Sequence, residues 1–414
     1  MIDQLLSFIS TQYGESAGLV AEVLLDTSFI WIPVILIIGF WQVWIQYIHA
    51  YFISKQVPVL LEIRIPREVS RTPAAMEMVF NTLYQKSQPQ SFAEAYWDGK
   101  VPPWFSIELV SLGGYVHLYI WTWQKFKNLI ESQLYAQYPS IEVVEAEDYS
   151  TKITNDPEKF NMVGFQWTFT KPVAYPIKTY IDYGLDKKAD KEEQKDDPLT
   201  SVLELLGSLK PKEQLWFQIV IQAHKKMGMK DGYVFPRPDW RAEAEREAGK
   251  IRDQYLVDKE KGLYMPITEA DMDSIKAIHR SLDKQAFDAV VRTLYVAEGD
   301  NFDTGTIAGL LGVMQQFNSN NMNGFRINWK TDFSHPWKDF RNVRRRKKER
   351  QYLDAWRRRS YFSEPYKYFK QKPIVLTTEE LATIFHIPGT VVQTPTLNRV
   401  SSRKGEAPSN IPTE

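Results

Sequence analysis

An uncharged stretch near the amino terminus constrains this chain more than any other feature. No residue from 27 to 54 is charged, and residues 29–45 read FIWIPVILIIGFWQVWI. A helix needs about 20 apolar residues to cross the hydrocarbon core of a bilayer, so the stretch predicts a transmembrane helix over residues 27–54. A buried helix of a soluble core is the alternative. A cleaved signal peptide is not favoured, because such signals have a basic start and a shorter apolar region.

The flanks of this stretch indicate an orientation. Residues 1–54 include acidic residues but no Lys or Arg, whereas basic residues follow from Lys55 onward. Basic residues stay on the cytoplasmic side, which predicts a single-pass protein with its amino terminus outside and residues 55–414 in the cytoplasm. Residues 1–26 are expected to form a short amphipathic segment. The expected interfacial anchors are Trp31, Trp41, Trp44, Tyr47 and Tyr51.

Residues 55–150 alternate between the two periods of regular structure. Leu61, Ile63 and Ile65 alternate as in a strand, and Pro73 after Thr72 starts a helical pattern. The pair Gly113-Gly114 then joins two further strands in a hairpin, before a second helix and a fourth strand. The order β-α-β-β-α-β predicts a ferredoxin-like domain, in which two helices pack on one face of an antiparallel sheet.

Residues 151–330 have the same kind of pattern with less regular spacing and predict a second α+β domain. A charged stretch at residues 186–197 is expected to be a solvated loop. The predicted fold class is therefore α+β: a transmembrane helix, tandem ferredoxin-like units and a basic helical segment toward the carboxyl end. The chain has no cysteine, which excludes disulfides and thiolate sites.

No motif in the sequence supports catalysis. The pairs Gly99-Lys100 and Gly249-Lys250 lack the upstream glycine and the following Ser or Thr of a phosphate-binding loop. The six histidines are scattered and none has paired ligand spacing. There is also no G-x-S-x-G sequence for a nucleophile. We therefore predict no enzyme activity, no cofactor and no metal.

Residues 331–370 form a basic, aromatic-rich segment. From Lys338 to Arg359 there are eleven basic and three acidic residues. Arginines interleaved with aromatic rings can bind phosphate backbones and stack on bases, but an anionic membrane, an acidic protein partner or plain solvent would suit the same segment. The candidate binding residues are Arg344, Arg345, Arg346, Lys347, Lys348, Arg350, Trp356, Arg357, Arg358 and Arg359, interleaved with Tyr352 and Tyr361.

Residues 371–414 predict a short helix and a linker-like tail. Thr377 and Glu380 have the spacing of a capping box, and Pro388-Gly389 ends the helical pattern. The last 21 residues, TPTLNRVSSRKGEAPSNIPTE, have the composition of a linker.

Three segments carry a resemblance to a known family. Residues 61–84 (LEIRIPREVSRTPAAMEMVFNTLY), 118–149 (LYIWTWQKFKNLIESQLYAQYPSIEVVEAEDY) and 378–412 (TEELATIFHIPGTVVQTPTLNRVSSRKGEAPSNIP) resemble the membrane-anchored, non-catalytic amino-terminal region of ATPases from bacterial type IV secretion and conjugative DNA-transfer systems. The resemblance covers about residues 30–414. In that family the tail leads into a P-loop motor domain, which this sequence lacks.

The resemblance implies a location in the bacterial inner membrane and a working partner. We expect a membrane-anchored, non-enzymatic component of a type IV secretion-like or conjugation-like machine, on which a separately encoded P-loop motor ATPase docks. The basic segment would contact the motor or its DNA substrate, and the chain would form a homo-oligomer or join a larger assembly. The alternative is a membrane-tethered nucleic-acid-binding protein that acts without a motor.

Overall fold

The structure is a computed structural model. The chain forms two compact units. One unit holds Met1–Lys55 and Pro89–Val101, and the other holds Gln56–Gln88 and Pro102–Glu414. The described residues are 20, 23–66, 71–86, 89, 91–154, 156, 158–186, 197–225, 239–258, 263–333, 337, 339–389 and 399–400. Most of the expected amphipathic segment 1–26, most of the charged loop 186–197 and most of the linker-like tail lie outside these residues.

The first unit consists of the long helix α3 (Ser28–Ser54) and the short helix α5 (Phe92–Tyr96). Among the described residues, α3 is the one helix long and apolar enough to cross a membrane. The Trp31 indole donates to the carbonyl of Leu24. Trp41 packs against Tyr96 and Trp44 against Trp97, with ring centroids 5.3 and 5.7 Å apart. Tyr47 and Tyr51 stack on each other along α3 and are exposed.

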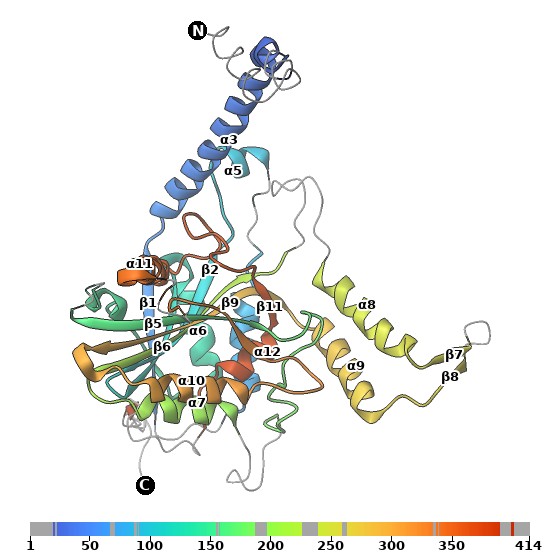
Figure 1. Ribbon diagram of the computed structural model, residues 1–414. Helices are drawn as coiled ribbons and strands as arrows, with labels where there is room; N and C mark the ends of the chain where they lie inside the picture. Colours follow the sequence, from blue (N-terminus) through green and yellow to red (C-terminus); the bar gives the residue numbers. More distant parts are fainter. Residues whose placement is uncertain are drawn as a thin grey trace, which may run out of the picture. The chain divides into compact units, whose positions relative to one another are not determined.

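The second unit contains the remaining elements (Figure 1). Its strands are β1 (Pro58–Pro66), β2 (Trp104–Leu112), β3 (Tyr115–Trp123), β4 (Glu142–Glu145), β5 (Phe160–Phe169), β6 (Glu213–Ala223), β7 (Leu256–Asp258), β8 (Leu263–Tyr264), β9 (Ala286–Glu298), β10 (Phe325–Lys330), β11 (Ile374–Thr377) and β12 (Arg399–Val400). Its α-helices are α4 (Pro73–Leu83), α6 (Gln124–Gln137), α7 (Pro198–Gly207), α8 (Trp240–Asp253), α9 (Glu269–Leu282), α10 (Thr304–Gln315), α11 (Val343–Arg357) and α12 (Thr378–Ile384). Short 3-10 helices are η1 (Tyr149–Lys152), η4 (Gly299–Asn301) and η6 (Phe340–Asn342).

Ten of the described strands form one sheet, which is antiparallel except where β12 pairs with β1. The amino-terminal half has the spatial order β4-β1-β3-β2. The carboxyl-terminal half has the order β10-β5-β9-β6. Each half therefore places its four strands in the order fourth, first, third, second, with one helix after the first strand and another after the third.

The two halves meet at their second strands. β2 and β6 pair along their whole common length, from Trp104↔Gln222 to Leu112↔Gln214. The joint at β2–β6 removes both strand edges from solvent, since an unpaired edge would expose a row of backbone hydrogen-bonding groups. The amino-terminal and carboxyl-terminal α+β regions thus share a continuous sheet.

One face of the sheet is covered by α4, α6, α7, α10 and α12. Side chains from these helices and from alternate strand positions form one apolar core, which includes Phe80, Leu134, Leu203 and Leu310. Pairs of helices lie side by side in each half, α4 with α6 and α7 with α10. Figure 1 shows α7 and α10 on one side of the sheet and α11 on the other.

A helical hairpin is inserted between β6 and β9. α8 and α9 pack on each other through small and β-branched residues, including Ala244, Ala248, Ile275 and Ile278. The short strands β7 and β8 connect them, and the hairpin projects from the sheet in Figure 1. In the amino-terminal half the second and third strands, β2 and β3, are joined by the tight turn Gly113-Gly114, where both glycines have positive φ. In the carboxyl-terminal half the α8–α9 hairpin takes the place of this turn between β6 and β9.

Candidate functional site

The helix α11 contains most of the predicted binding residues and lies on the second face of the sheet. Its first turn is capped by Asp339, whose carboxylate accepts hydrogen bonds from the backbone N–H groups of Arg344 and Arg345 at 2.8 and 2.6 Å. Such a cap satisfies donors that have no partner within the helix. Arg341 and Asn342 reverse the chain before the helix with φ of 61° and 57°.

One side of α11 is locked to the sheet by aromatic residues. Tyr352 and Trp356 are fully buried. The Tyr352 hydroxyl donates to the carbonyl of Phe165 at 2.7 Å, and its ring lies so close to Gly164 that a Cβ there would be 2.4 Å from the Tyr352 Cε1 atom. The Trp356 indole donates to the Tyr149 hydroxyl at 3.1 Å. Trp356 and Tyr352 therefore fill the interior and are not placed to stack on bases.

Arg359 follows the helix and ends in a buried ion pair. It is 0% exposed, and its Nε and Nη2 atoms lie 3.0 and 3.1 Å from the two carboxylate oxygens of Glu108 on β2. It also pairs with Asp148. Burial would raise the pKa of Glu108, but Arg359 together with hydrogen bonds from Ser106 and Gln218 holds that pKa below its usual value. This bidentate ion pair links the residue that follows the carboxyl end of α11 to β2 in the centre of the sheet.

A second buried arginine, Arg292 on β9, supports the end of α11. Its guanidinium donates to Gln218, to the Ala355 carbonyl at 3.1 Å and to the Ser360 carbonyl at 3.4 Å. The last carbonyls of a helix carry partial negative charge and have no partner within the helix. Burial lowers the pKa of Arg292 to about 10. The Arg292 guanidinium is therefore still cationic at neutral pH, and it donates hydrogen bonds to carbonyls at the carboxyl end of α11.

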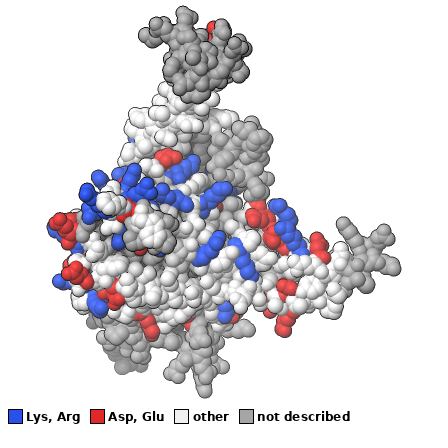
Figure 2. Space-filling model, in the orientation of Figure 1, with Lys and Arg blue, Asp and Glu red and all other residues white. Residues whose placement is uncertain are grey.

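The other side of α11 presents basic residues to solvent. Arg344, Arg346, Lys347 and Arg350 are exposed, and in the described part of the chain their side chains form no hydrogen bond or ion pair. Figure 2 shows Lys and Arg side chains gathered over the region of α11. We call these four residues the basic stripe. Like charges on neighbouring turns repel each other, so the stripe is suited to an acidic or phosphate-bearing ligand.

A hollow of about 470 Å³ continues from the stripe. Arg350, Arg357 and Arg358 line it together with Asp354 and Tyr366. Arg358 pairs with Asp354 at 3.0 Å, and the Tyr366 hydroxyl donates to the same carboxylate at 2.7 Å. Three guanidinium groups around one carboxylate leave positive charge in excess, so the hollow can accept an anionic group such as a phosphate or carboxylate.

The remaining predicted residues have partners within the fold. Arg345 pairs with Glu349 at 2.7 Å, and the Arg357 guanidinium donates to the carbonyls of Ser150 and Ile153. Lys348 lies over the Phe333 ring, 3.8 Å from its centroid. These side chains hold the helix in place more than they extend the stripe.

Sequence reasoning missed three exposed apolar residues beside the stripe. Trp337, Phe340 and Val343 are 78%, 80% and 64% exposed. Large apolar residues next to unpaired basic ones are typical of recognition surfaces. The sequence segment WKDFRNVRRR contained this signal, because its aromatic residues precede the helical period that buries Tyr352 and Trp356.

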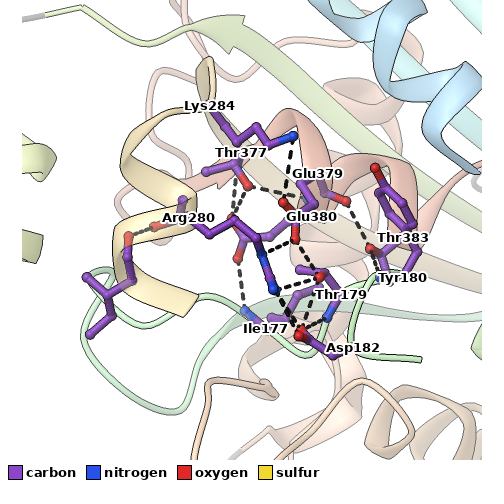
Figure 3. Close-up of polar contacts among 12 residues, drawn as sticks. Ile177, Thr179, Tyr180, Asp182, Arg280, Lys284, Thr377, Glu379, Glu380 and Thr383 are labelled. Atoms are coloured by element: carbon purple, nitrogen blue, oxygen red, sulfur yellow. Dashed lines mark hydrogen bonds and ion pairs between the residues drawn. The ribbon is translucent and has the colours of Figure 1, made fainter. Parts of the chain in front are cut away.

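A second polar cluster lies around α12 (Figure 3). The predicted capping box is confirmed: the Thr377 hydroxyl accepts from the Glu380 N–H, and the Glu380 carboxylate accepts from the Thr377 N–H. Burial raises the pKa of Glu380 to about 7.

The neighbouring Glu379 pairs with Arg280 of α9 at 3.0 Å and accepts a hydrogen bond from Thr179 at 2.5 Å. Arg280 also pairs with Asp182 at 2.9 Å. Glu379 and Glu380 are buried, and Arg280 and Asp182 are half-buried. Glu379 and Asp182 have a cation within the protein, so the arrangement holds α12 against α9 and residues 177–182. Within the described residues no group of three His, Asp or Glu is placed to hold a metal ion.

Architecture and site together define a class of protein: a mixed α and β chain with a long, unburied apolar helix, one mostly antiparallel sheet and the helix α11 packed on its second face. Sequence comparison identifies the family. The chain belongs to the family of the domain of unknown function DUF8128, which matches residues 102–399 and so begins just before β2. No curated protein matches the chain.

Proposed function

We propose that this chain is a membrane-anchored, non-enzymatic docking platform of a type IV secretion-like or conjugation-like machine. In this proposal α3 spans the bacterial inner membrane, the second unit lies in the cytoplasm, and a separately encoded P-loop motor ATPase binds the basic stripe. The observation that carries the proposal is the two-sided character of α11. One side is locked to the sheet, while the other presents four basic residues without partners in the described chain.

The membrane part of the proposal is supported by α3 and its flanks. The helix has 27 residues, enough to cross a bilayer with some tilt. The basic residues that follow it favour a cytoplasmic second unit. Because the chain has no cysteine, single cysteines can be introduced at Val20, which precedes α3 and is exposed, and at Met78, for labelling in intact cells with a membrane-impermeant maleimide. Labelling at 20 with protection at 78 is the expected result, and the reverse pattern would reject this orientation.

The fold of the second unit supports a tandem ferredoxin-like description. Each half has the strand order fourth, first, third, second, and its two helices pack on the same face of the sheet. This is the arrangement of a split β-α-β unit. The α8–α9 hairpin would then be an insertion in the second copy, and the basic helical segment an addition after it.

Co-purification tests the docking partner. The full chain, solubilised in mild detergent, is expected to bring down a P-loop ATPase. Replacing the basic stripe (Arg344→Gln, Arg346→Gln, Lys347→Gln, Arg350→Gln) is expected to abolish this. The matched control removes four exposed lysines elsewhere, Lys152, Lys210, Lys250 and Lys276, which are all exposed. Equal loss in both variants, or no ATPase with the unsubstituted chain, would reject the proposal.

A second candidate function is nucleic-acid binding without a motor, favoured by the three-arginine hollow and the exposed Trp337 and Phe340. Each phosphate contact adds to the salt dependence of binding. If this function is right, the purified chain alone binds single-stranded DNA at low salt, and the stripe variant has a smaller slope of log affinity against log salt. No binding at low salt rejects it.

A further inference from the structure

The short segment that carries α5 presents large apolar side chains to the outside of the first unit. Phe92 and Trp97 are 66% and 74% exposed. Large apolar side chains with this exposure usually mark a contact surface. Phe92 stacks on Tyr96, and Trp97 also packs on Trp44 of α3, so the segment lies directly against the apolar helix.

The seat of α5 is specific. The Trp44 indole on α3 donates to the Tyr96 carbonyl at 2.9 Å. Gly99 has a φ of 65°, and a Cβ at this position would be 2.5 Å from the backbone carbonyl of Ile48. Only glycine permits both this backbone conformation and this approach. The segment therefore reaches α3 at Trp44 and Ile48.

The length of α3 gives the depth of this contact. A helix rises about 1.5 Å per residue, so a hydrocarbon core of about 30 Å takes about 20 residues. Counted from Ser28, the first residue of α3, the far boundary of the core falls at Ile48. The segment also contains an ion pair, in which the Lys100 Nζ atom lies 2.6 Å from the Glu94 Oε1 atom. Apolar rings beside charged groups suit the boundary between acyl chains and headgroups.

We infer that residues 91–101 form a second lipid-binding element, seated by Gly99 at the acyl–headgroup boundary. Phe92 and Trp97 insert among the acyl chains, and the Glu94–Lys100 pair lies at the level of the headgroups. The occupant of this surface is the bilayer itself. The inference rests on the proposed membrane anchor, and its test separates failure of the one from failure of the other.

The absence of native cysteine permits spin labels at single introduced cysteines in the full chain. The chain is reconstituted in phosphatidylcholine–phosphatidylglycerol vesicles, and collisions of each label with oxygen and with a water-soluble nickel chelate are measured. The positions are Phe92→Cys on α5, Leu36→Cys on α3 and Met78→Cys on α4, where Met78 is 54% exposed. We expect positions 36 and 92 to favour oxygen and position 78 to favour the chelate.

The outcomes are distinct. If position 36 favours oxygen while position 92 resembles position 78, the lipid contact of α5 is rejected and the anchor stands. If position 36 favours the chelate, the anchor and the inference both fall.

A second variant tests the seat. Gly99→Ala, made with the label at 92, is expected to abolish the oxygen preference at 92, whereas a label at 36 in the same variant keeps it. Gly39→Ala is the matched control, because a Cβ at Gly39 meets nothing within 4 Å. Retention of the oxygen preference at 92 in Gly99→Ala would overturn the role of the seat.

Discussion

Two arginine triplets lie at the two ends of the basic helix, Arg344–Arg346 and Arg357–Arg359. Both triplets read RRR, yet their surroundings in the fold differ. In the first triplet Arg344 and Arg346 are exposed. In the second, Arg359 is fully buried between Glu108 and Asp148, and Arg357 donates to backbone carbonyls of η1 and the residue after it. Arg344 and Arg346 present charge to solvent, whereas Arg357 and Arg359 hold the end of the helix against η1 and the sheet.

The difference shows how a buried charge is tolerated. Removing a guanidinium from water is costly unless carboxylates and hydrogen bonds replace the lost hydration. The Arg359 guanidinium donates to the carboxylates of Glu108 and Asp148 and to the Arg357 carbonyl. Ser106 and Gln218 donate to Glu108 in turn, so the buried carboxylate is also hydrogen-bonded. The exposed guanidinium of Arg344 remains hydrated by bulk water and needs no such partners. Substitutions at the two triplets should therefore have different effects on stability and on binding.

The largest effect is expected from Arg359→Met. The substitution leaves Glu108 buried without its cation, which should lower the free energy of unfolding by about 3–5 kcal/mol. Urea unfolding of the full chain in detergent measures it, with Arg344→Met as the matched control. A loss below about 1 kcal/mol, the size expected of an exposed pair, would contradict the role of Arg359. The double variant Arg359→Met, Glu108→Gln should recover part of the loss.

A smaller loss is expected from Gly164→Ala, which tests the locked side of α11. The added Cβ would overlap the Tyr352 ring and push the helix off the sheet, at a cost of about 1–3 kcal/mol. Gly312→Ala on α10 is the control, because a Cβ there meets nothing within 4 Å and alanine favours a helix. If both variants unfold at the same urea concentration, Tyr352 does not hold the helix as closely as the structure indicates.

Glu380 is a buried carboxyl group without a paired cation, unlike Glu108, so we expect it to make the stability of the protein depend on pH. The folded pKa of Glu380 is about 7, against an ordinary value of 4.5. The folded chain keeps a proton that the unfolded chain releases, so the contribution of Glu380 to stability is complete below pH 4.5 and is lost as the pH rises through about 7. Unfolding experiments between pH 4.5 and 7.5 should show this decline, and Glu380→Gln should flatten it. The exposed Glu204→Gln should leave the slope unchanged.

The smallest effect on stability is expected from the basic stripe. Replacing Arg344, Arg346, Lys347 and Arg350 by glutamine should change the free energy of unfolding by no more than about 0.5 kcal/mol at each position. Relief of repulsion between like charges acts in the stabilising direction. Urea unfolding of the variant used for co-purification checks that any lost binding is not lost folding. A large destabilisation would mean that the stripe also has a structural role.

Much of the secondary structure could be predicted because it depends on local periodicity. The alternation at Leu61, Ile63 and Ile65 lies in β1, and the Gly113-Gly114 pair turns β2 into β3. The capping box at Thr377 was readable for the same reason, since its partners are three residues apart. Local hydrogen bonds and side-chain periods need no knowledge of the rest of the chain.

The joint between the two halves could not be predicted. β2 pairs with β6 over about a hundred residues of intervening sequence, and the β6–β9 pair is separated by the α8–α9 insertion. The edge strand of one half can satisfy its backbone groups with many partners, and only packing of the complete sheet selects one. The partners of Arg359 could not be predicted for the same reason, since Glu108 lies 251 residues away in the sequence.

The sequence by itself determined an apolar helix long enough to span a membrane, the positions of most strands and helices, and an excess of basic residues near residue 350. Only the tertiary structure decided which of those residues are available. Helical period places Tyr352, Trp356 and Arg359 toward the sheet, but their burial depends on a surface made by β2, β5 and β9 together. Charge can be read from composition, whereas exposure is a property of the whole fold, because it depends on residues that are distant in the chain.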